Sequence, residues 1–265
     1  MGNRGLLTAL LFVMLTQWVT GQGVLQPKQL NFDNQGIVYS KELAFNIKVH
    51  TNGYAFGVNI GDLKTYYLTR FYHLSLGELK HPREFRKNDF IAATGGGARS
   101  YIFGKQNNLF VLRGGLGEKR YLSEKAKRKG LAVGISYEAG PSIGILKPYY
   151  LEIATLDNPG NDTRSVKYTP ETEDLFTNVN SITGSSGLGK GWGEVKIQPG
   201  LHAVAATHFD WGAFDEFVKA LEVGIMGDFY FKKLPLMIES ERFSNSENQS
   251  FYINLFVNFQ FGKRR

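Results

Sequence analysis

The sequence predicts an all-β fold: a transmembrane, antiparallel, up-and-down β-barrel of about eight to ten strands with long loops. Three observations support this prediction. The first residues have the pattern of an export signal. Apolar and polar residues alternate in segment after segment, and the segment Phe251–Phe261 is apolar on one face only. In a barrel that spans a membrane, such a face contacts lipid while the polar face lines the interior.

Residues 1–22 are expected to be a cleaved signal peptide, and residues 23–265 the barrel. Arg4 precedes an apolar run from Leu6 to Val19, and small or polar residues follow it. This run is shorter than the roughly 20 apolar residues of a membrane-spanning helix. A retained amino-terminal anchor is the alternative. The chain contains no cysteine, which excludes disulfides, thiolate metal ligands and attachment of lipid to cysteine.

The first strand segment, 38–50, is apolar at most odd positions and polar at even positions. After Thr51–Gly53 the apolar positions become even, so these residues form either a hairpin turn or a bulge. The segment 65–77 is rich in residues that favour strands. Its orientation stays open, because Arg70 shares a face with apolar residues.

The segment 101–115 predicts two strands around a tight turn at Gln106–Asn108. If Ala139–Ser142 is also a turn, the barrel has ten strands. If the alternation continues through it and Thr51–Gly53 is only a bulge, the number is eight. Two further strands, in 195–209 and 217–231, are joined by a short connection.

Four irregular stretches separate the strand segments, roughly 78–99, 118–129, 157–193 and 232–249. Loops this long are unusual in a compact soluble domain. Outer-membrane barrels, in contrast, have long loops at one rim and short turns at the other. A soluble alternative is a large exported sandwich or a lipocalin-like barrel, whose core would contain the apolar faces.

Charged residues of both signs lie on the faces expected to point inward. They predict a paired network that fills a narrow lumen, since eight or ten strands enclose little space. A water-filled path is the alternative. The candidate network consists of Glu42, Lys48, Arg113, Glu138, Lys196 and Glu222.

The last strand resembles the signal that barrel-assembly machinery recognises in outer-membrane proteins. Phe259 and Phe261 are its final apolar residues, and the basic residues 263–265 are expected to lie beyond it.

Two basic stretches are candidate contact sites. A solvated rim is the simplest interpretation; the functional one is contact with lipopolysaccharide phosphates outside, or with an acidic envelope protein in the periplasm. The net charge of +7 favours anionic lipid, lipopolysaccharide or acidic proteins, and nucleic acid is not an expected partner of an exported chain. The residues are Lys80, Arg83, Arg86 and Lys87 in the first stretch, and Lys119, Arg120, Lys125, Lys127, Arg128 and Lys129 in the second.

Several motifs together resemble a family of small outer-membrane β-barrel proteins from Bacteroidetes-type Gram-negative bacteria. They are "HTNGYAFGVNIG", "KTYYLTRFYHLSLGELKHPREFR", "YIFGKQNNLFVLRGG", "EKAKRKG" and "GPSIGILKPYYLEI". The resemblance covers most of residues 23–265, and 157–193 is the least characteristic part. It implies the barrel fold and an outer-membrane location, and it supplies no catalytic residues.

Two motifs that could carry chemistry favour ordinary structure. In "GSSGLGKG", Gly191 follows Lys190 where a phosphate-binding loop needs serine or threonine. In "HFDWGAFDE", His208 and Asp210 lie near a turn that Asp210 is expected to cap. We therefore expect a non-enzymatic outer-membrane barrel without cofactors, acting as a structural or accessory subunit of an envelope assembly. The alternatives are a narrow pore or small-solute transporter, or a barrel enzyme acting on lipid or peptide with His208 and Asp210.

Overall fold

The computed structural model describes residues 39–87, 99–123, 130–154, 163–213, 215–239 and 247–265. The predicted signal peptide, 1–22, lies outside these residues. Within the described part of the chain, no helix has the length and apolar character needed to cross a membrane.

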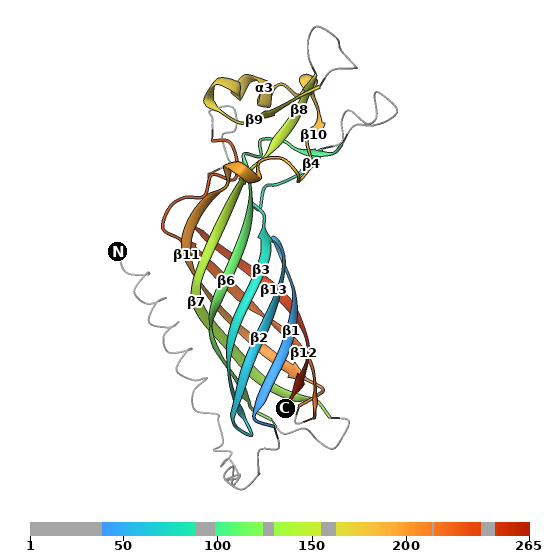
Figure 1. Ribbon diagram of the computed structural model, residues 1–265, viewed down its shortest axis with the longest axis vertical. Coiled ribbons are helices and arrows are strands. Elements are labelled where there is room, and N and C mark those ends of the chain that lie inside the picture. Colours follow the sequence, from blue (N-terminus) through green and yellow to red (C-terminus); the bar gives the residue numbers. More distant parts are fainter. Residues whose placement is uncertain (1–38, 88–98, 124–129, 155–162, 214, 240–246) are drawn as a thin grey trace, which may run out of the picture. The chain divides into compact units, whose positions relative to one another are not determined.

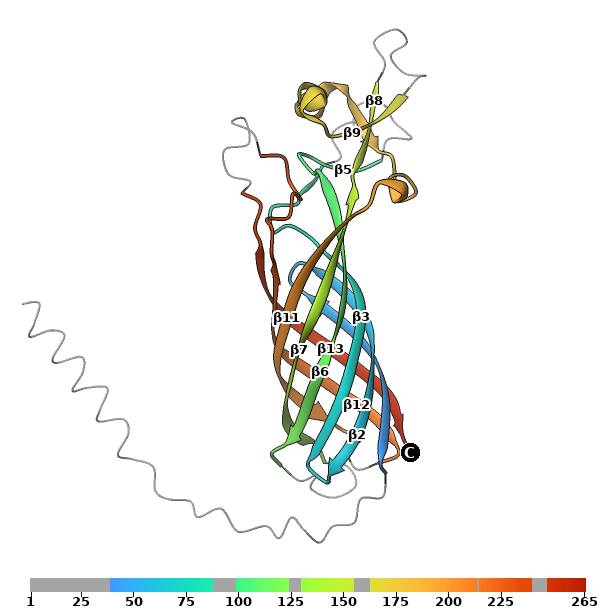
Figure 2. The ribbon, with the colours of Figure 1, turned by 60° about the vertical axis from the view of Figure 1, so that its left-hand side comes forward.

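Eight antiparallel strands close into a barrel, which confirms the predicted fold class with the smaller strand count (Figures 1 and 2). The barrel closes where the first strand pairs with the last, with Phe45 opposite Phe261 and Lys48 opposite Asn258. The strands are β1 (Lys41–His50), β2 (Gly53–Thr65), β3 (Leu68–Leu79), β6 (Asn107–Tyr121), β7 (Ala132–Pro148), β11 (Lys196–Asp210), β12 (Phe217–Tyr230) and β13 (Phe251–Arg264).

The strand number is eight for a different reason than the sequence suggested. Strand β7 continues through Ala139–Ser142 and pairs with β6 and β11 on its two sides. The tight turn predicted at Gln106–Asn108 is wrong, because β5 (Tyr101–Ile102) pairs with β4 (Arg86–Lys87) outside the barrel. Thr51–Gly53 is a hairpin turn and not a bulge.

Glycine is required where this hairpin turns. Gly53 has a φ of +149°, and a Cβ there would lie 2.1 Å from the carbonyl oxygen of Glu78. No other residue type fits both the conformation and the close approach of β3. The change of apolar positions from odd to even numbers therefore results from the reversal of the chain at this turn.

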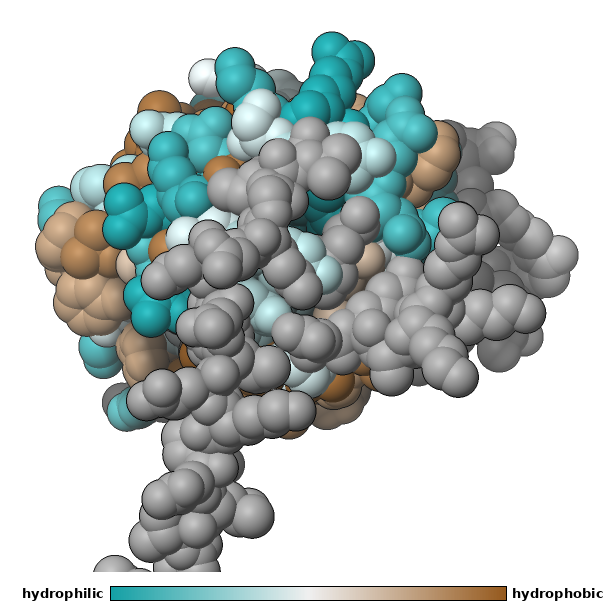
Figure 3. Space-filling view, turned by 90° about the horizontal axis from the view of Figure 1, so that it is seen from below, coloured by the Kyte–Doolittle hydropathy of each residue, from teal (hydrophilic) through white to brown (hydrophobic). Residues whose placement is uncertain are grey.

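The strands alternate between an apolar outer face and a polar inner face. In β1, Phe45 and Val49 are exposed on the outside while Asn46 and Lys48 are buried inside. In β3, whose orientation the pattern left open, Tyr72, Leu74 and Leu76 face outward. Viewed from the end of the barrel that carries the carboxyl terminus, hydrophilic residues gather over the end and hydrophobic residues lie at its margin (Figure 3).

The connections differ between the two barrel ends. The lower end in Figure 1 carries the β2–β3, β6–β7 and β11–β12 connections and the carboxyl terminus. The upper end carries the β1–β2 turn and the three longer connections, β3–β6, β7–β11 and β12–β13. Three of the four predicted irregular stretches fall in the long connections of the upper end, as expected. The fourth, 118–129, does not: β6 continues to Tyr121, and the rest of the stretch belongs to the β6–β7 connection at the lower end.

The β7–β11 connection contains ordered structure, so the prediction of an irregular stretch over 157–193 is wrong for its described part. A three-stranded sheet, in the order β10-β8-β9, packs with a short helix around Leu151, Phe176 and Ile182. Its elements are β8 (Tyr150–Ala154), β9 (Thr163–Lys167), β10 (Ile182–Ser185), α3 (Glu173–Thr177) and the 3-10 turns η2 (Pro170–Thr172), η3 (Val179–Ser181) and η4 (Trp192–Glu194).

Candidate functional site: the filled lumen

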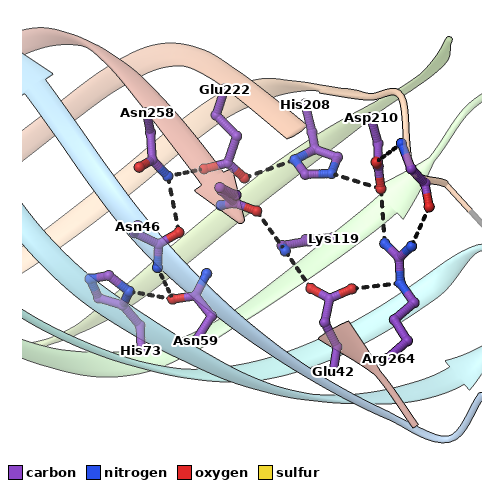
Figure 4. Close-up of polar contacts among 12 residues, drawn as sticks. Glu42, Asn46, Asn59, His73, Lys119, His208, Asp210, Glu222, Asn258 and Arg264 are labelled. Atoms are coloured by element: carbon purple, nitrogen blue, oxygen red, sulfur yellow. Dashed lines mark hydrogen bonds and ion pairs between the residues drawn. The ribbon is translucent and has the colours of Figure 1, made fainter. Parts of the chain in front are cut away.

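The lower part of the lumen is crossed by a chain of ion pairs (Figure 4). The carboxylate of Glu42 accepts hydrogen bonds from Lys119 at 2.8 Å and from Arg264 at 2.9 Å. Arg264 also donates to Asp210 at 2.9 Å, and the Tyr121 hydroxyl donates to the same carboxylate at 2.6 Å. These residues come from β1, β6, β11 and β13, so the ion pairs connect opposite walls of the barrel.

A second group of contacts continues the network toward the middle of the barrel. Glu222 lies 3.0 Å from His208 Nδ1 and accepts a hydrogen bond from Asn258 Nδ2 at 2.7 Å. Asn258 contacts Asn46 at 3.4 Å. Lys119 reaches this level as well, because its ammonium also donates to the amide oxygen of Gln260 at 2.9 Å.

The middle of the lumen is filled by contacts between β1, β2, β3 and β7. Asn46 donates to Asn59 at 2.8 Å, and Asn59 lies 2.6 Å from His73 Nδ1. The carboxylate of Glu138 lies 3.3 Å from the Lys48 ammonium and 3.6 Å from His73.

Above this level, Arg113 and Asp228 form a bidentate ion pair across the lumen. Arg113 Nε and Nη2 donate to the two carboxylate oxygens at 2.7 and 2.9 Å. The Asp228 side chain is 0% exposed and the Arg113 side chain 3%. Two parallel charge-assisted bonds fix both side chains in one geometry.

The upper end of the lumen is closed by an apolar cluster. Leu234 and Leu236, from the β12–β13 connection, pack against buried residues of the barrel wall. Asn248 holds this connection in place by accepting from the backbone N–H groups of Leu236 and Met237 at 2.9 and 3.0 Å. The wall residues of the cluster are Leu79, Leu109, Val111, Leu146, Tyr230 and Tyr252.

This filling has a clear physical reason. A charge removed from water is strongly unfavourable unless an opposite charge and hydrogen bonds compensate it. Within the described lumen, the carboxylates pair with lysine and arginine side chains or with His208. Eight strands leave an interior just wide enough for side chains. The inner face is therefore a packed polar core.

The predicted network residues lie in the lumen, with one exception. Glu42, Lys48, Arg113, Glu138 and Glu222 are buried there. The placement of Lys196 is corrected: its position in β11 has the inward phase, but it is the first residue of the strand and is exposed. At the upper rim the wall no longer encloses a side chain, so alternation alone does not predict burial.

Two cations of the network were assigned elsewhere by the sequence. Lys119 was predicted in a basic contact stretch, and Arg264 in a tail beyond the last strand, yet both are almost fully buried. Lys119 pairs with Glu42, and Arg264 lies between the carboxylates of Glu42 and Asp210. The reason is that β6 and β13 extend further than their apolar alternation, to Tyr121 and Arg264. The inward and outward alternation of each strand, extended to these residues, would have placed both side chains inside the barrel.

The remaining basic residues divide between the two barrel ends. Lys80, Arg83, Arg86 and Lys87 follow β3 at the upper end, where Lys80 and Arg86 line a pocket of about 380 Å³. Arg120 is exposed on the outer wall and pairs with Glu118 at 2.9 Å. The other predicted contacts, Lys125, Lys127, Arg128 and Lys129, lie outside the described residues.

The remaining candidate residues named from the sequence are those of the β11–β12 turn and of the predicted assembly signal. His208 and Asp210 are buried in the lumen, and Asp210 accepts from the backbone N–H of Gly212 at 2.7 Å, which confirms the predicted turn capping. Phe259 and Phe261 are about half exposed on the outer wall of β13.

The chain matches no known protein-family model and no curated protein. Two solved structures are similar to it. The crystal structure of Ail, the attachment invasion locus protein of Yersinia pestis, has 8% sequence identity and a TM-score of 0.34, and the match covers 85% of this chain and 95% of Ail. The N-terminal β-barrel domain of Pseudomonas aeruginosa OprF has 12% identity and a TM-score of 0.31, with 84% and 98% covered.

Proposed function

We propose that this chain is an integral outer-membrane barrel that does not conduct solutes and acts as a structural or accessory subunit of an envelope assembly. The observation that carries the proposal is the filled lumen: ion pairs cross it at several levels, and Leu234 and Leu236 close its upper end. A barrel filled in this way contributes through its outer wall and its ends.

The outer wall supports the membrane location. Large apolar side chains such as Phe56, Leu255 and Ile253 are 56 to 61% exposed, on the face opposite to the charged interior. In water this would be a large unpartnered apolar surface. In a bilayer it matches the apolar band of outer-membrane barrels, whose closed sheet also satisfies every backbone group in the wall.

The connections support an orientation in the membrane. Short turns and both chain ends of such barrels lie in the periplasm, and longer loops lie outside. The lower end then faces the periplasm, and the upper end, with β8–β10, faces the exterior. In this orientation Lys80, Arg83, Arg86 and Lys87 are candidates for contact with lipopolysaccharide phosphates, because arginine and lysine bind phosphate.

The upper end also offers apolar contact surface for a protein partner. Phe85 is 73% exposed and Leu188 65%, both in connections beyond the barrel strands. Apolar side chains in this position would contact water and not lipid, and exposed apolar groups beside basic ones are typical of binding surfaces.

Gentle detergent extraction of the tagged, full-length protein from its native membrane tests the proposal. We expect the barrel to sediment with outer-membrane fragments and to co-purify with a stable envelope partner. The double variant Phe85→Ser/Leu188→Ser is expected to lose the partner, whereas Lys232→Gln, another exposed upper-end position, is expected to retain it. Recovery of the unaltered protein as a lone monomer would contradict the subunit role.

A further inference from the structure

A groove with a volume of about 850 Å³ lies on the outer wall of the barrel, near its lower end. It crosses β3, β6, β7 and β11, and its outward side chains include Arg70, Tyr72, Leu116, Tyr137 and Ala203. Since these side chains have the outward phase of their strands, the groove opens to the surroundings of the barrel, and the inward residues Phe71, Glu138 and Val204 line its side toward the lumen.

Two guanidinium groups lie at one side of the groove: Arg70 lines it, and Arg120 flanks it through its ion pair with the lining residue Glu118. Glu118 accepts from Arg70 Nε at 2.8 Å and from Arg120 Nη2 at 2.9 Å, and it also accepts from the Tyr137 hydroxyl. The carboxylate itself is largely covered, with its side chain 18% exposed, whereas the Arg70 side chain is 62% exposed and that of Arg120 54%. A guanidinium has five N–H donors, so both arginines keep donors that point away from Glu118.

The floor of the groove is apolar and formed by small residues. Ala139 of β7 lies opposite Leu116 of β6 on one side and Ala203 of β11 on the other. Between the larger side chains of Tyr72 and Tyr137, these alanines leave a hollow over the sheet. Such a floor accommodates a hydrocarbon chain, while the arginines at the edge suit an anionic group.

We propose that this groove binds one anionic glycerophospholipid, with its phosphate on the exposed N–H donors of Arg70 and Arg120 that Glu118 does not use, and an acyl chain over Ala139 and Ala203. Lys64 also lines the groove, and Arg120 flanks it beside Glu118. Among the outward side chains, these three cations therefore outnumber the carboxylates of Glu118 and Asp62, while the lining residue Glu138 is paired with Lys48 in the lumen. The inference rests on the membrane location proposed above. There the lower rim lies at the level of the headgroups of the periplasmic leaflet, and arginine recognises phosphate through its planar fork of donors.

Native mass spectrometry of the full-length protein, reconstituted in phosphatidylcholine with a minor fraction of phosphatidylglycerol, tests the proposal. We expect one phosphatidylglycerol to stay bound to the unaltered barrel and its retention to fall at least tenfold in Arg70→Gln/Arg120→Gln. The matched control is Lys263→Gln, an exposed residue that pairs with Glu216 at 2.8 Å outside the groove. Equal retention in the double variant and the unaltered protein would overturn the proposal.

A second variant keeps the test independent of the folding of the arginine variant. Ala203→Phe fills the groove and leaves the arginines in place, and it is expected to reduce retention as well. Excess inorganic phosphate is expected not to displace the lipid, because phosphate cannot occupy the apolar floor; full displacement would overturn the proposed acyl contact. If the unaltered barrel inserts into the bilayer but retains no lipid, only this inference fails. If it does not insert, the proposed function fails.

Discussion

Replacing Arg113 by methionine tests the interpretation of the lumen as a packed polar core. The change removes both hydrogen bonds to Asp228, at 2.7 and 2.9 Å, and leaves a carboxylate that is 0% exposed without its cation. Removing one partner of a buried ion pair costs about 3–5 kcal/mol, because the remaining charge is uncompensated. We expect the free energy of unfolding of Arg113→Met to fall by about this amount.

Urea unfolding of the barrel in lipid vesicles, followed by tryptophan fluorescence, measures this loss. The double variant Arg113→Met/Asp228→Leu removes both charges and is expected to recover most of it, since apolar replacement of a whole buried pair is often neutral. Lys263→Gln, which breaks the exposed pair with Glu216, is the control and should cost about 1 kcal/mol or less. A loss in Arg113→Met no larger than in this control would refute the reasoning.

Three further predictions concern the ends of the barrel and its assembly. Leu236→Ala, in the apolar closure, should lower the free energy of unfolding by about 2–5 kcal/mol in the same urea assay; no change would contradict its packing role. Phe261→Ser should reduce the amount of folded barrel in cells while the purified chain still folds in detergent, and equal amounts in cells would exclude a role of Phe261 in the assembly signal. Burial lowers the pKa of His81, whose Nδ1 accepts from the backbone N–H of Arg83. The folded form therefore disfavours the proton, and hydrogen exchange of residues 80–87 should lose protection as the pH falls below about 6.5; unchanged protection would contradict this.

The sequence predicts the barrel wall well because alternation is a local property. In a strand such as β13, successive side chains point to opposite faces of the sheet, so the outward positions of Phe259 and Phe261 follow from the pattern alone. Inward charges such as Glu42 and Glu138 follow from the same rule. Strand β3 shows the limit of this rule. The sequence left its orientation open because Arg70, a charged residue, lies on the outer face among apolar residues near the lower rim.

What the sequence could not predict depends on pairing between distant segments. The strand count required knowing that Tyr101–Ile102 pairs with Arg86–Lys87 and that β7 continues past Ala139. The burial of Lys119 depends on the carboxylate of Glu42, which is 77 positions away in the chain. The closure by Leu234 and Leu236 likewise exists only because Asn248 and the upper wall hold that connection over the lumen.

Single-channel recording of the purified, full-length protein in planar bilayers tests the central claim most directly. With its lumen crossed by ion pairs and its upper end closed, the inserted barrel is expected to give no steady conductance above that of the bare bilayer. Insertion is verified in the same preparation by protection of the barrel strands from protease. Reproducible, long-lived conductance steps from the inserted protein would contradict the filled lumen and support the narrow pore instead.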